Sequence, residues 1–231
     1  MATERNDTPL LPEQFLQNNS ETIIQNTKSF SNLMMRYRCA IREVQTKLEI
    51  LDDEFSNTYQ RNPIASIQTR IKKPFSIYNK LTRKGYEVTL DNITEHLNDV
   101  AGIRVTCPFI TDIYEVAGLL AEQDDISVLS VKDYIKNPKP NGYRSYHMIV
   151  EIPVFFSSGK TPMKVEVQVR TIAMDFWASL EHQIHYKKNV ENIHGLESVS
   201  QELKDCADAI AKIDAHMLSI KEMIGEFQDL S

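Results

Sequence analysis

The segment VEVQVRT, residues 165–171, alternates strictly between apolar and polar side chains. Successive side chains on a β-strand point to opposite faces, so this pattern predicts a strand with one buried face and one polar face. Three valines would face the core, and the polar face would carry Glu166, Gln168 and Arg170. Because these groups are costly to bury without partners, we expect their face either to contact water or to line a polar site.

The flanking sequence predicts further strands and helices. Extended segments are expected at 65–73, 101–109, 126–132 and 146–153, and helices at 13–55, 74–84, 92–98, 111–122, 172–188 and 196–228. Pro74 suits the first turn of its helix, Gly85 suits the end of that helix, and Thr171 can cap the helix that follows the opening strand. We therefore predict an α+β fold with a mixed central sheet of about five strands, wrapped by helices and bounded by a long helix at each end.

Apolar residues recur at steps of three and four along both terminal helices, from Phe30 to Phe55 and from Leu203 to Phe227. Each stripe can pack on its own domain, or the two can pack together within one subunit or between subunits of a homo-oligomer. We expect four regions along the chain. They are a disordered N-terminus (1–12), a helical region (13–60), a core (61–190) and a C-terminal helix with a possible role in oligomerisation (191–231).

The composition indicates a globular protein of the cytoplasm. The 231 residues are 42% hydrophobic and 25% charged, which is ordinary for a soluble domain. No apolar run approaches the roughly 18 residues of a membrane-spanning helix, and no secretory signal is visible. The three cysteines are far apart and odd in number, which favours a reduced intracellular protein over a disulfide scaffold.

The net charge of −6 conceals two basic segments. Residues 55–86 hold seven basic side chains and residues 134–150 hold three, and neither segment contains an acid. The remainder of the chain carries 16 basic residues against 32 acidic ones. A basic site on an otherwise acidic protein attracts a small polyanion without making the whole surface bind nucleic acid. The alternative is two basic loops that bind nothing.

Two segments carry polar residues suited to phosphate and metal binding. RIKKPFSIYNK (70–80) joins an extended piece to the start of a helix, where the Ser76 hydroxyl, several lysines and the helix N-terminus favour phosphate. DVAGIRV (99–105) places Asp99 at the mouth of a strand and Arg104 on the polar face of that strand. An isolated aspartate in this position is more often a helix cap or a salt-bridge partner.

A third segment, KPNGYRSYH (139–147), combines an aromatic residue with basic ones. The Asn141-Gly142 pair predicts a turn that projects Tyr143 outward. A ring on a basic loop can stack on a nucleotide base, or alternatively it can fold back onto the sheet. His147, on the strand that follows, is more often a structural histidine than a catalytic one.

These segments, with VEVQVRTIAMDFWASLEH (165–182), resemble the synthetase motifs of the RelA/SpoT homologue family. The resemblance covers about residues 65–188, and the length and helical ends are similar to the single-domain members, the small alarmone synthetases. It implies a nucleotidyltransferase-like synthetase fold and transfer of pyrophosphate from ATP to the 3′-hydroxyl of GDP or GTP. The products would be (p)ppGpp, the alarmone of the bacterial stringent response, and AMP. The resemblance also implies Mg²⁺ and a homotetramer.

Carried over residue by residue, the resemblance implies a role for each side chain. Asp99 and Glu166 would hold Mg²⁺, and Glu166 would also take the proton from the guanosine 3′-hydroxyl. Adenine would lie between Arg70 and Arg104, and guanine would stack on Tyr143. The residues contacting the ATP phosphates would be Lys72, Ser76, Lys80, Lys84 and His147. The residues on the GDP or GTP side would also include Lys139 and Arg144, with Gln168 and Arg170 supporting Glu166.

The sequence fits other functions less well. Long members of the family carry a hydrolase domain with a His-Asp pair, and none of the six histidines here precedes an aspartate, so we expect synthesis without hydrolysis. A toxin-like relative that pyrophosphorylates the 3′ end of tRNA would need a wider basic surface. A non-catalytic nucleotide-binding regulator would not need both carboxylates, and a polymerase-β-type transferase would need an Asp-x-Asp pair that this sequence lacks. We therefore expect nucleotide substrates, with no membrane and no nucleic acid required.

Overall fold

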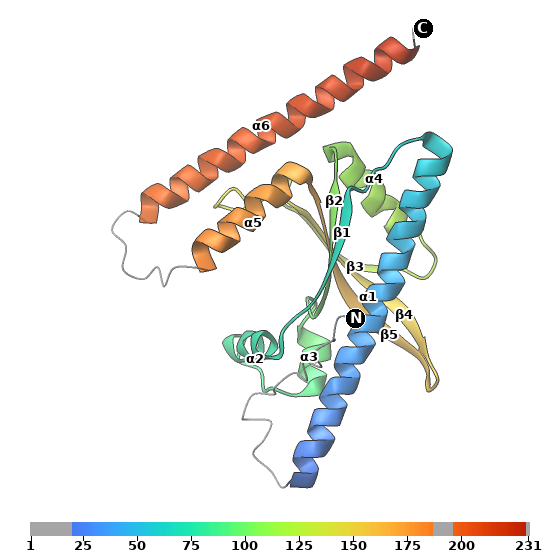
Figure 1. Cartoon of the computed structure of the whole chain (residues 1–231). Coiled ribbons are helices and arrows are strands. Elements are labelled where there is room, and N and C mark those ends of the chain that lie inside the picture. Colours follow the sequence, from blue (N-terminus) through green and yellow to red (C-terminus); the bar gives the residue numbers. More distant parts are fainter. Residues whose placement is uncertain (1–19, 187–195, 230–231) are drawn as a thin grey trace, which may run out of the picture.

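The computed structural model describes residues 20–186 and 196–229, in which six helices surround a five-stranded sheet (Figure 1). The strands are β1 (Ser66–Ile71), β2 (Ala101–Cys107), β3 (Ser127–Asp133), β4 (Tyr146–Phe156) and β5 (Gly159–Thr171). The helices are α1 (Ser20–Tyr59), α2 (Pro74–Arg83), α3 (Leu90–His96), α4 (Ile110–Ala121), α5 (Ile172–Tyr186) and α6 (Leu196–Asp229). The predicted α+β fold with a mixed five-stranded sheet is confirmed. The expected disorder of residues 1–12 lies outside the described residues.

The strand order is β1-β2-β5-β4-β3, so the opening segment forms the central strand, β5. Only the pair β2 and β5 is parallel, and the other three pairs are antiparallel. The predicted buried face of β5 is confirmed, because Val165, Val167 and Val169 are fully buried. Each such side chain contributes roughly 1.5–3 kcal/mol through burial, which fixes the face that β5 turns to the core.

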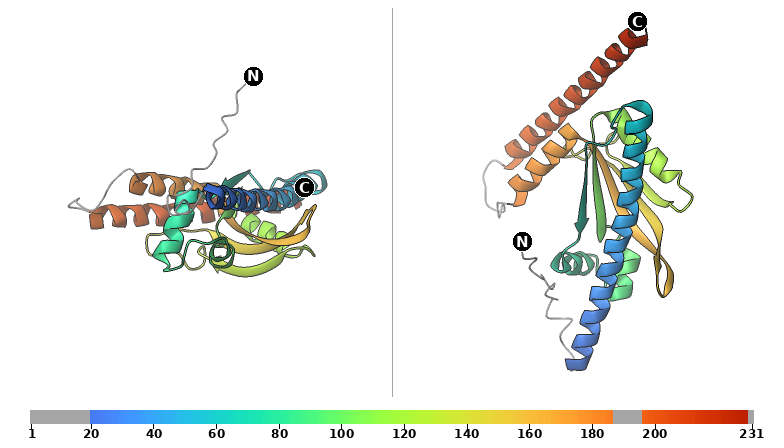
Figure 2. Two further views of the ribbon diagram at one scale, coloured as in Figure 1. Left: turned by 90° about the horizontal axis from the view of Figure 1, so that it is seen from below. Right: turned by 45° about the vertical axis from the view of Figure 1, so that its right-hand side comes forward.

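Helices α1 and α4 cover this apolar face of the sheet. The stripe from Phe30 to Phe55 on α1 is largely buried against the strands, so it packs on its own domain. At one end of the strands lie α2 and α3, and at the other end lie α5 and α6, as Figure 1 and the right-hand view of Figure 2 show. Helix α5 packs on β2 and β5 from the opposite, polar face.

The stripe on α6 divides into two parts. Near its start, α6 packs on α5, where Trp177 and Ala207 belong to a small second core and the Trp177 indole donates to the Leu203 carbonyl at 2.9 Å. Farther along, Ile213 and Met217 are 58% and 49% exposed. The two terminal stripes therefore pack on different elements, since α1 lies on the sheet and α6 lies on α5 and α4.

Local signals in the sequence account for several element boundaries. The predicted cap at Thr171 is confirmed, because its hydroxyl accepts a hydrogen bond from the Met174 amide at 3.0 Å. Pro74 begins α2, and Gly85 follows its end with a φ of +79°, a conformation that favours glycine. Across the described ranges, none of the helices has the length and apolarity that crossing a membrane requires.

Candidate active site

The register of the sheet gathers the polar side chains of the predicted site into two rows. One row consists of Gln68, Arg104, Gln168, His147 and Lys132, and the next consists of Arg70, Gly102, Glu166, Ile149 and Ser130. Directly opposed residues on neighbouring strands have Cβ atoms about 5 Å apart, so each row forms a continuous strip across all five strands. Segments far apart in the sequence thus meet on the face opposite α1.

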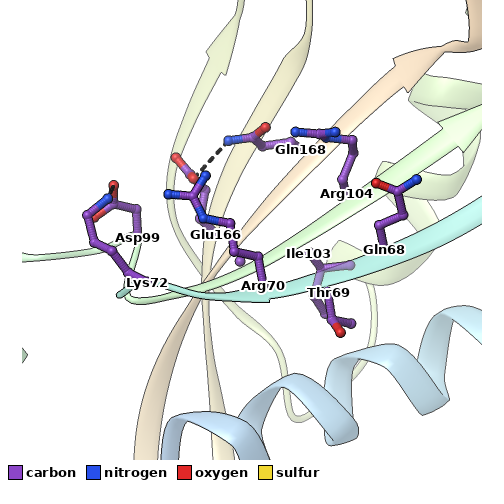
Figure 3. A pocket seen from close by; sticks show the side chains of 10 residues that line it. Gln68, Thr69, Arg70, Lys72, Asp99, Ile103, Arg104, Glu166 and Gln168 are labelled. Carbon is purple, nitrogen blue, oxygen red and sulfur yellow. Dashed lines mark hydrogen bonds and ion pairs between the residues drawn. The ribbon is translucent and has the colours of Figure 1, made fainter. Parts of the chain in front are cut away.

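A first cavity of about 540 Å³ lies over β1 and β2. Figure 3 shows Arg70, Arg104 and Glu166 rising from the same face of the sheet, with Asp99 at one end. Gly102 lies in the row between Arg70 and Glu166, and its missing side chain leaves the middle of this cavity open. Two guanidinium groups beside an open space suit a planar base, because guanidinium groups stack on flat π systems.

Asp99 forms the charged end of the first cavity. Lys72 and Lys80 both donate to its Oδ2 atom at 2.7 Å, whereas its buried Oδ1 atom has no hydrogen-bond partner within the described part of the chain. Burial raises the pKa of Asp99, but the hydrogen bonds and charges of the two lysines outweigh burial and hold that pKa below its usual value. The carboxylate is therefore ionised at neutral pH, with one oxygen available to a further ligand.

A second cavity of about 700 Å³ adjoins the first. Its basic and aromatic lining includes Lys80, Lys84, Lys132, Lys139, Tyr134 and Tyr143. Three residues line both cavities, namely Asp99, Glu166 and Gln168. The two carboxylates therefore lie where the cavities meet.

The Tyr143 side chain lies back against the sheet instead of projecting outward as the turn signal predicted, and this placement leaves its predicted role in stacking on guanine untested. Its hydroxyl accepts a hydrogen bond from Arg170 at 2.5 Å and lies 2.8 Å from Nε2 of His147. The half-buried ring remains part of the wall of the second cavity. The Lys139 ammonium lies 4.7 Å from the ring centre, a cation–π contact that places positive charge beside the ring.

His147 lies in the second cavity, on the side of Tyr143, rather than in the first. Burial, with the nearby charges of Arg170, Lys139 and Lys132, lowers the pKa of His147 to about 3. The imidazole is therefore neutral and adds no positive charge for phosphate. Its Nδ1 atom lies 3.7 Å from Oε1 of Glu166.

The remaining predicted residues occupy different places. Lys80 and Lys84 reach the second cavity from α2, whereas Ser76 lies outside the residues that line either cavity. Arg144 turns toward α6, where it pairs with Asp208 at 2.9 Å and donates to the Ala207 carbonyl at 3.2 Å. It anchors the Tyr143 loop instead of lining the cavity. Arg170 is buried behind the same cavity wall, with 4% of its surface exposed.

Sequence reasoning missed two acids on α5. Asp175 pairs with Arg104 at 3.3 Å and with Arg170 at 3.1 Å, and Glu181 lines the second cavity and accepts from Asn141 at 3.2 Å. Asp175 lies in the first turn of a helix, where an acid is expected for capping reasons alone. The only available signal was their spacing of six residues on one helix, which is too common to indicate a site.

The carboxylates fit a magnesium ion. Carboxylate oxygens are the protein ligands that Mg²⁺ prefers, and the ion usually takes one or two of them and completes its shell with water and substrate phosphates. Asp99 offers its unpartnered Oδ1 atom, and Glu166 lies at the same junction of the cavities. In the described ranges no cluster of three or more His, Cys, Asp or Glu residues could enclose a metal, so the substrate would have to supply the remaining ligands.

A polar sheet face with two adjoining cavities, basic walls and a shared pair of carboxylates is suited to an enzyme that acts on phosphate-bearing substrates. Residues 69–191 match the family model described as the region found in RelA/SpoT proteins. GTP pyrophosphokinase YwaC of Bacillus subtilis (strain 168) is 43% identical over 197 residues, which span 85% of this chain and 92% of YwaC. The chain therefore belongs to the RelA/SpoT family.

Solved structures agree in fold. Small alarmone synthetase 2 from Bacillus subtilis matches with a TM-score of 0.75 at 42% identity, over 84% of this chain and 98% of that one. Small alarmone synthetase 1 from Bacillus subtilis, bound to its product pppGpp, matches with a TM-score of 0.77 at 34% identity, over 85% of this chain and 98% of that one. The single-domain branch predicted from the motifs is thus the branch whose structures this chain resembles.

Proposed function

We propose that this protein is a (p)ppGpp synthetase that transfers pyrophosphate from ATP to the 3′-hydroxyl of GDP or GTP and releases AMP. The observation that carries the proposal is the junction of the two cavities, where Asp99 and Glu166 line both. A group transferred between two nucleotides has to pass through the point at which their sites meet. The pppGpp-bound relative and the GTP pyrophosphokinase relative support the same reaction.

In the proposed arrangement, ATP occupies the first cavity with its adenine between Arg70 and Arg104. The acceptor occupies the second cavity with guanine against Tyr143 and its phosphates near Lys139. The acceptor 3′-oxygen then attacks the β-phosphorus of ATP, and the bond from that phosphorus to the oxygen bridging the α- and β-phosphates breaks. Glu166 takes the proton of the 3′-hydroxyl, which is the work of a general base within hydrogen-bond reach.

The lysines at Asp99 explain how the site changes on binding. Without nucleotide, Lys72 and Lys80 neutralise the Asp99 carboxylate. The ATP phosphates offer the lysines a stronger anion, and Mg²⁺ held by Asp99 and Glu166 would neutralise charge on the transferring group. Since such transfers leave the protein little covalent work, positioning and charge neutralisation account for most of the catalysis.

The direct test is incubation of the purified protein with Mg²⁺, ATP and GDP or GTP, followed by separation of the nucleotides by anion exchange. We expect a more anionic guanosine product with an equal amount of AMP. The variant Glu166→Gln should bind both nucleotides and lose at least about a hundredfold in kcat, because a general base contributes about 10²–10⁴-fold. Glu151→Gln is the matched control, since Glu151 lies on the neighbouring strand β4, away from both cavities.

Other outcomes of this assay would identify another function. ATP consumption only when tRNA is added would indicate the tRNA 3′-end pyrophosphokinase. Tight nucleotide binding without turnover in either assay would indicate a regulator without catalytic activity. A rate for Glu166→Gln within threefold of the unmodified protein would contradict the assignment of the base.

We further infer a homotetramer in the cytoplasm. Apolar side chains left exposed on α5 (Ile172, Phe176, Leu180 and Ile184) and on α6 (Ile213, Met217 and Ile224) could be covered by other subunits. The three cysteines are free thiols, as a reducing compartment would keep them. Light scattering that gave the mass of one subunit would contradict the tetramer.

A further inference from the structure

Arg170 makes more polar contacts than any other side chain at the polar face that we describe, although it reaches neither cavity. Its guanidinium donates to Gln168 Oε1 at 2.9 Å and to the Tyr143 hydroxyl at 2.5 Å, and it pairs with Asp175 at 3.1 Å. Ser145 accepts from its Nε atom at 3.3 Å. A guanidinium carries five N–H donors and has no acceptor, so every atom facing it has to accept.

The first consequence concerns the amide of Gln168. Because its oxygen has to face Arg170, its NH₂ group has to point the other way, where it donates to Oε2 of Glu166 at 2.9 Å. A free glutamine amide could turn by 180° and present its oxygen to the carboxylate, which would repel it. Arg170 excludes that orientation, since the turned amide would place N–H groups against N–H groups.

The second consequence concerns His147. The Tyr143 hydroxyl oxygen accepts from Arg170, so its single hydrogen is free to be donated, and the atom within reach is His147 Nε2 at 2.8 Å. When the Tyr143 hydroxyl donates to Nε2, that nitrogen carries no hydrogen, and the hydrogen of the neutral ring lies on Nδ1. That N–H faces Oε1 of Glu166 across 3.7 Å, a gap that a small movement on substrate binding would close.

We propose that Arg170 is a positioning residue that directs two N–H donors, the Gln168 amide and His147 Nδ1–H, at the two oxygens of Glu166. The inference rests on the proposed function, in which Glu166 is the base. Two such donors hold the carboxylate in one rotamer and leave one electron pair on each oxygen, one for Mg²⁺ and one for the acceptor hydroxyl. Arg170 lines neither cavity, so it would act on Glu166 through Gln168, Tyr143 and His147.

The variant Gln168→Met tests the first donor. It keeps the length of the side chain and removes the N–H that faces Glu166 without placing a second negative charge beside that carboxylate. If Gln168 served packing alone, this variant would leave kcat within threefold and the melting temperature unchanged. The proposal predicts that kcat falls about a hundredfold, the cost of misplacing a reacting group by about 1 Å, while both KM values stay within threefold.

The variant Tyr143→Phe tests the second donor and retains the ring that would stack on guanine. The proposal predicts a fall in kcat of about tenfold with the GDP KM within threefold. It also predicts a spectroscopic change, because ¹⁵N-histidine NMR should show the Nδ1–H tautomer for His147 in the unmodified protein and a mixture in the variant. Tyr114→Phe is the matched control, because it removes a hydrogen-bonded hydroxyl on α4, away from both cavities.

The outcomes separate this inference from the proposed function. An Nε2–H tautomer for His147 in the unmodified protein would overturn the inference even if the enzyme makes (p)ppGpp. A kcat within threefold for both variants, or a rise in KM alone, would also overturn it. The NMR measurement needs no turnover, so an inactive protein with the Nδ1–H tautomer would contradict the function and leave the hydrogen-bond arrangement intact.

Discussion

Replacing Gly102 with valine should weaken ATP binding without harming the fold. A Cβ atom built at Gly102 would have the Arg70 carbonyl oxygen as its nearest neighbour, at 3.7 Å, which is ordinary van der Waals contact. The position lies within β2, where a β-branched residue is favoured and a glycine costs roughly 0.5–1 kcal/mol relative to alanine. The variant should therefore be as stable as the unmodified protein or slightly more stable.

The same side chain should interfere with the first cavity. Three added carbon atoms would displace about three waters, or roughly 90 Å³ of liquid volume, from the middle of a cavity of about 540 Å³. Overfilling a packed site typically costs 1–3 kcal/mol, which corresponds to about a 5- to 150-fold loss of affinity. We expect the ATP KM to rise by that factor and the GDP KM, which depends on the second cavity, to change less than threefold.

Thermal melts and steady-state kinetics check both halves of this prediction. Gly118→Ala is the control, because Gly118 lies within α4 with no atom of the described residues close to the added methyl group. It should raise stability by up to about 1 kcal/mol and leave both KM values unchanged. An ATP KM for Gly102→Val within twofold of the unmodified value would refute the placement of ATP in the first cavity.

Three further predictions concern α6. Arg144→Met should raise the GDP KM about tenfold and leave the ATP KM unchanged, because the Tyr143 loop loses its charged hydrogen bonds to α6. Asp208→Asn keeps the hydrogen bond from Arg144 to the Ala207 carbonyl, so it should have a smaller effect in the same kinetic assay. Burial raises the pKa of Asp214, so its ionisation weakens the folded state as pH rises from about 4 toward neutral. In urea titrations, the difference in free energy of unfolding between Asp214→Asn and the unmodified protein should therefore shift in favour of the variant as pH rises through that interval. Below the interval, the difference should not change with pH. Met217→Asp, which puts a charge on the exposed stripe, should lower the mass measured by light scattering if that stripe joins subunits.

The fold was largely predictable from the sequence because its elements carry local signals. Strict alternation identified β5, and the turn residues on either side of α2 identified its ends. The division of the α6 stripe was not predictable, because steps of three and four describe a whole helix and do not reveal which turns meet a neighbour. In the structure, α5 is long enough to cover only the part of α6 around Ala207.

The site was predictable as a set of residues and less so as a set of contacts. Alternation placed Glu166 and Gln168 on one face, but it could not reveal that Arg170, two residues farther on, lies beneath the Tyr143 ring. Burial of an arginine depends on partners supplied by other segments, here Ser145 and the start of α5. The Asn141-Gly142 signal likewise predicts that the chain turns there, but the direction of the Tyr143 side chain depends on tertiary contacts that the signal does not reveal.

The position of Glu166 is determined by residues that never meet a substrate. Side chains along a strand alternate between faces, so a slip of one residue between β5 and its neighbours would bury Glu166 and expose the valines. Such a slip would forfeit the burial of Val165, Val167 and Val169, at roughly 1.5–3 kcal/mol each, and would bury a carboxylate as well. Burial of the apolar face of β5 therefore stabilises the strand register that places Glu166 on the polar face. Substitutions such as Val167→Ala should lower stability by roughly 1–3 kcal/mol while leaving kcat near normal in the folded fraction, because the two remaining valines still exclude the slipped register.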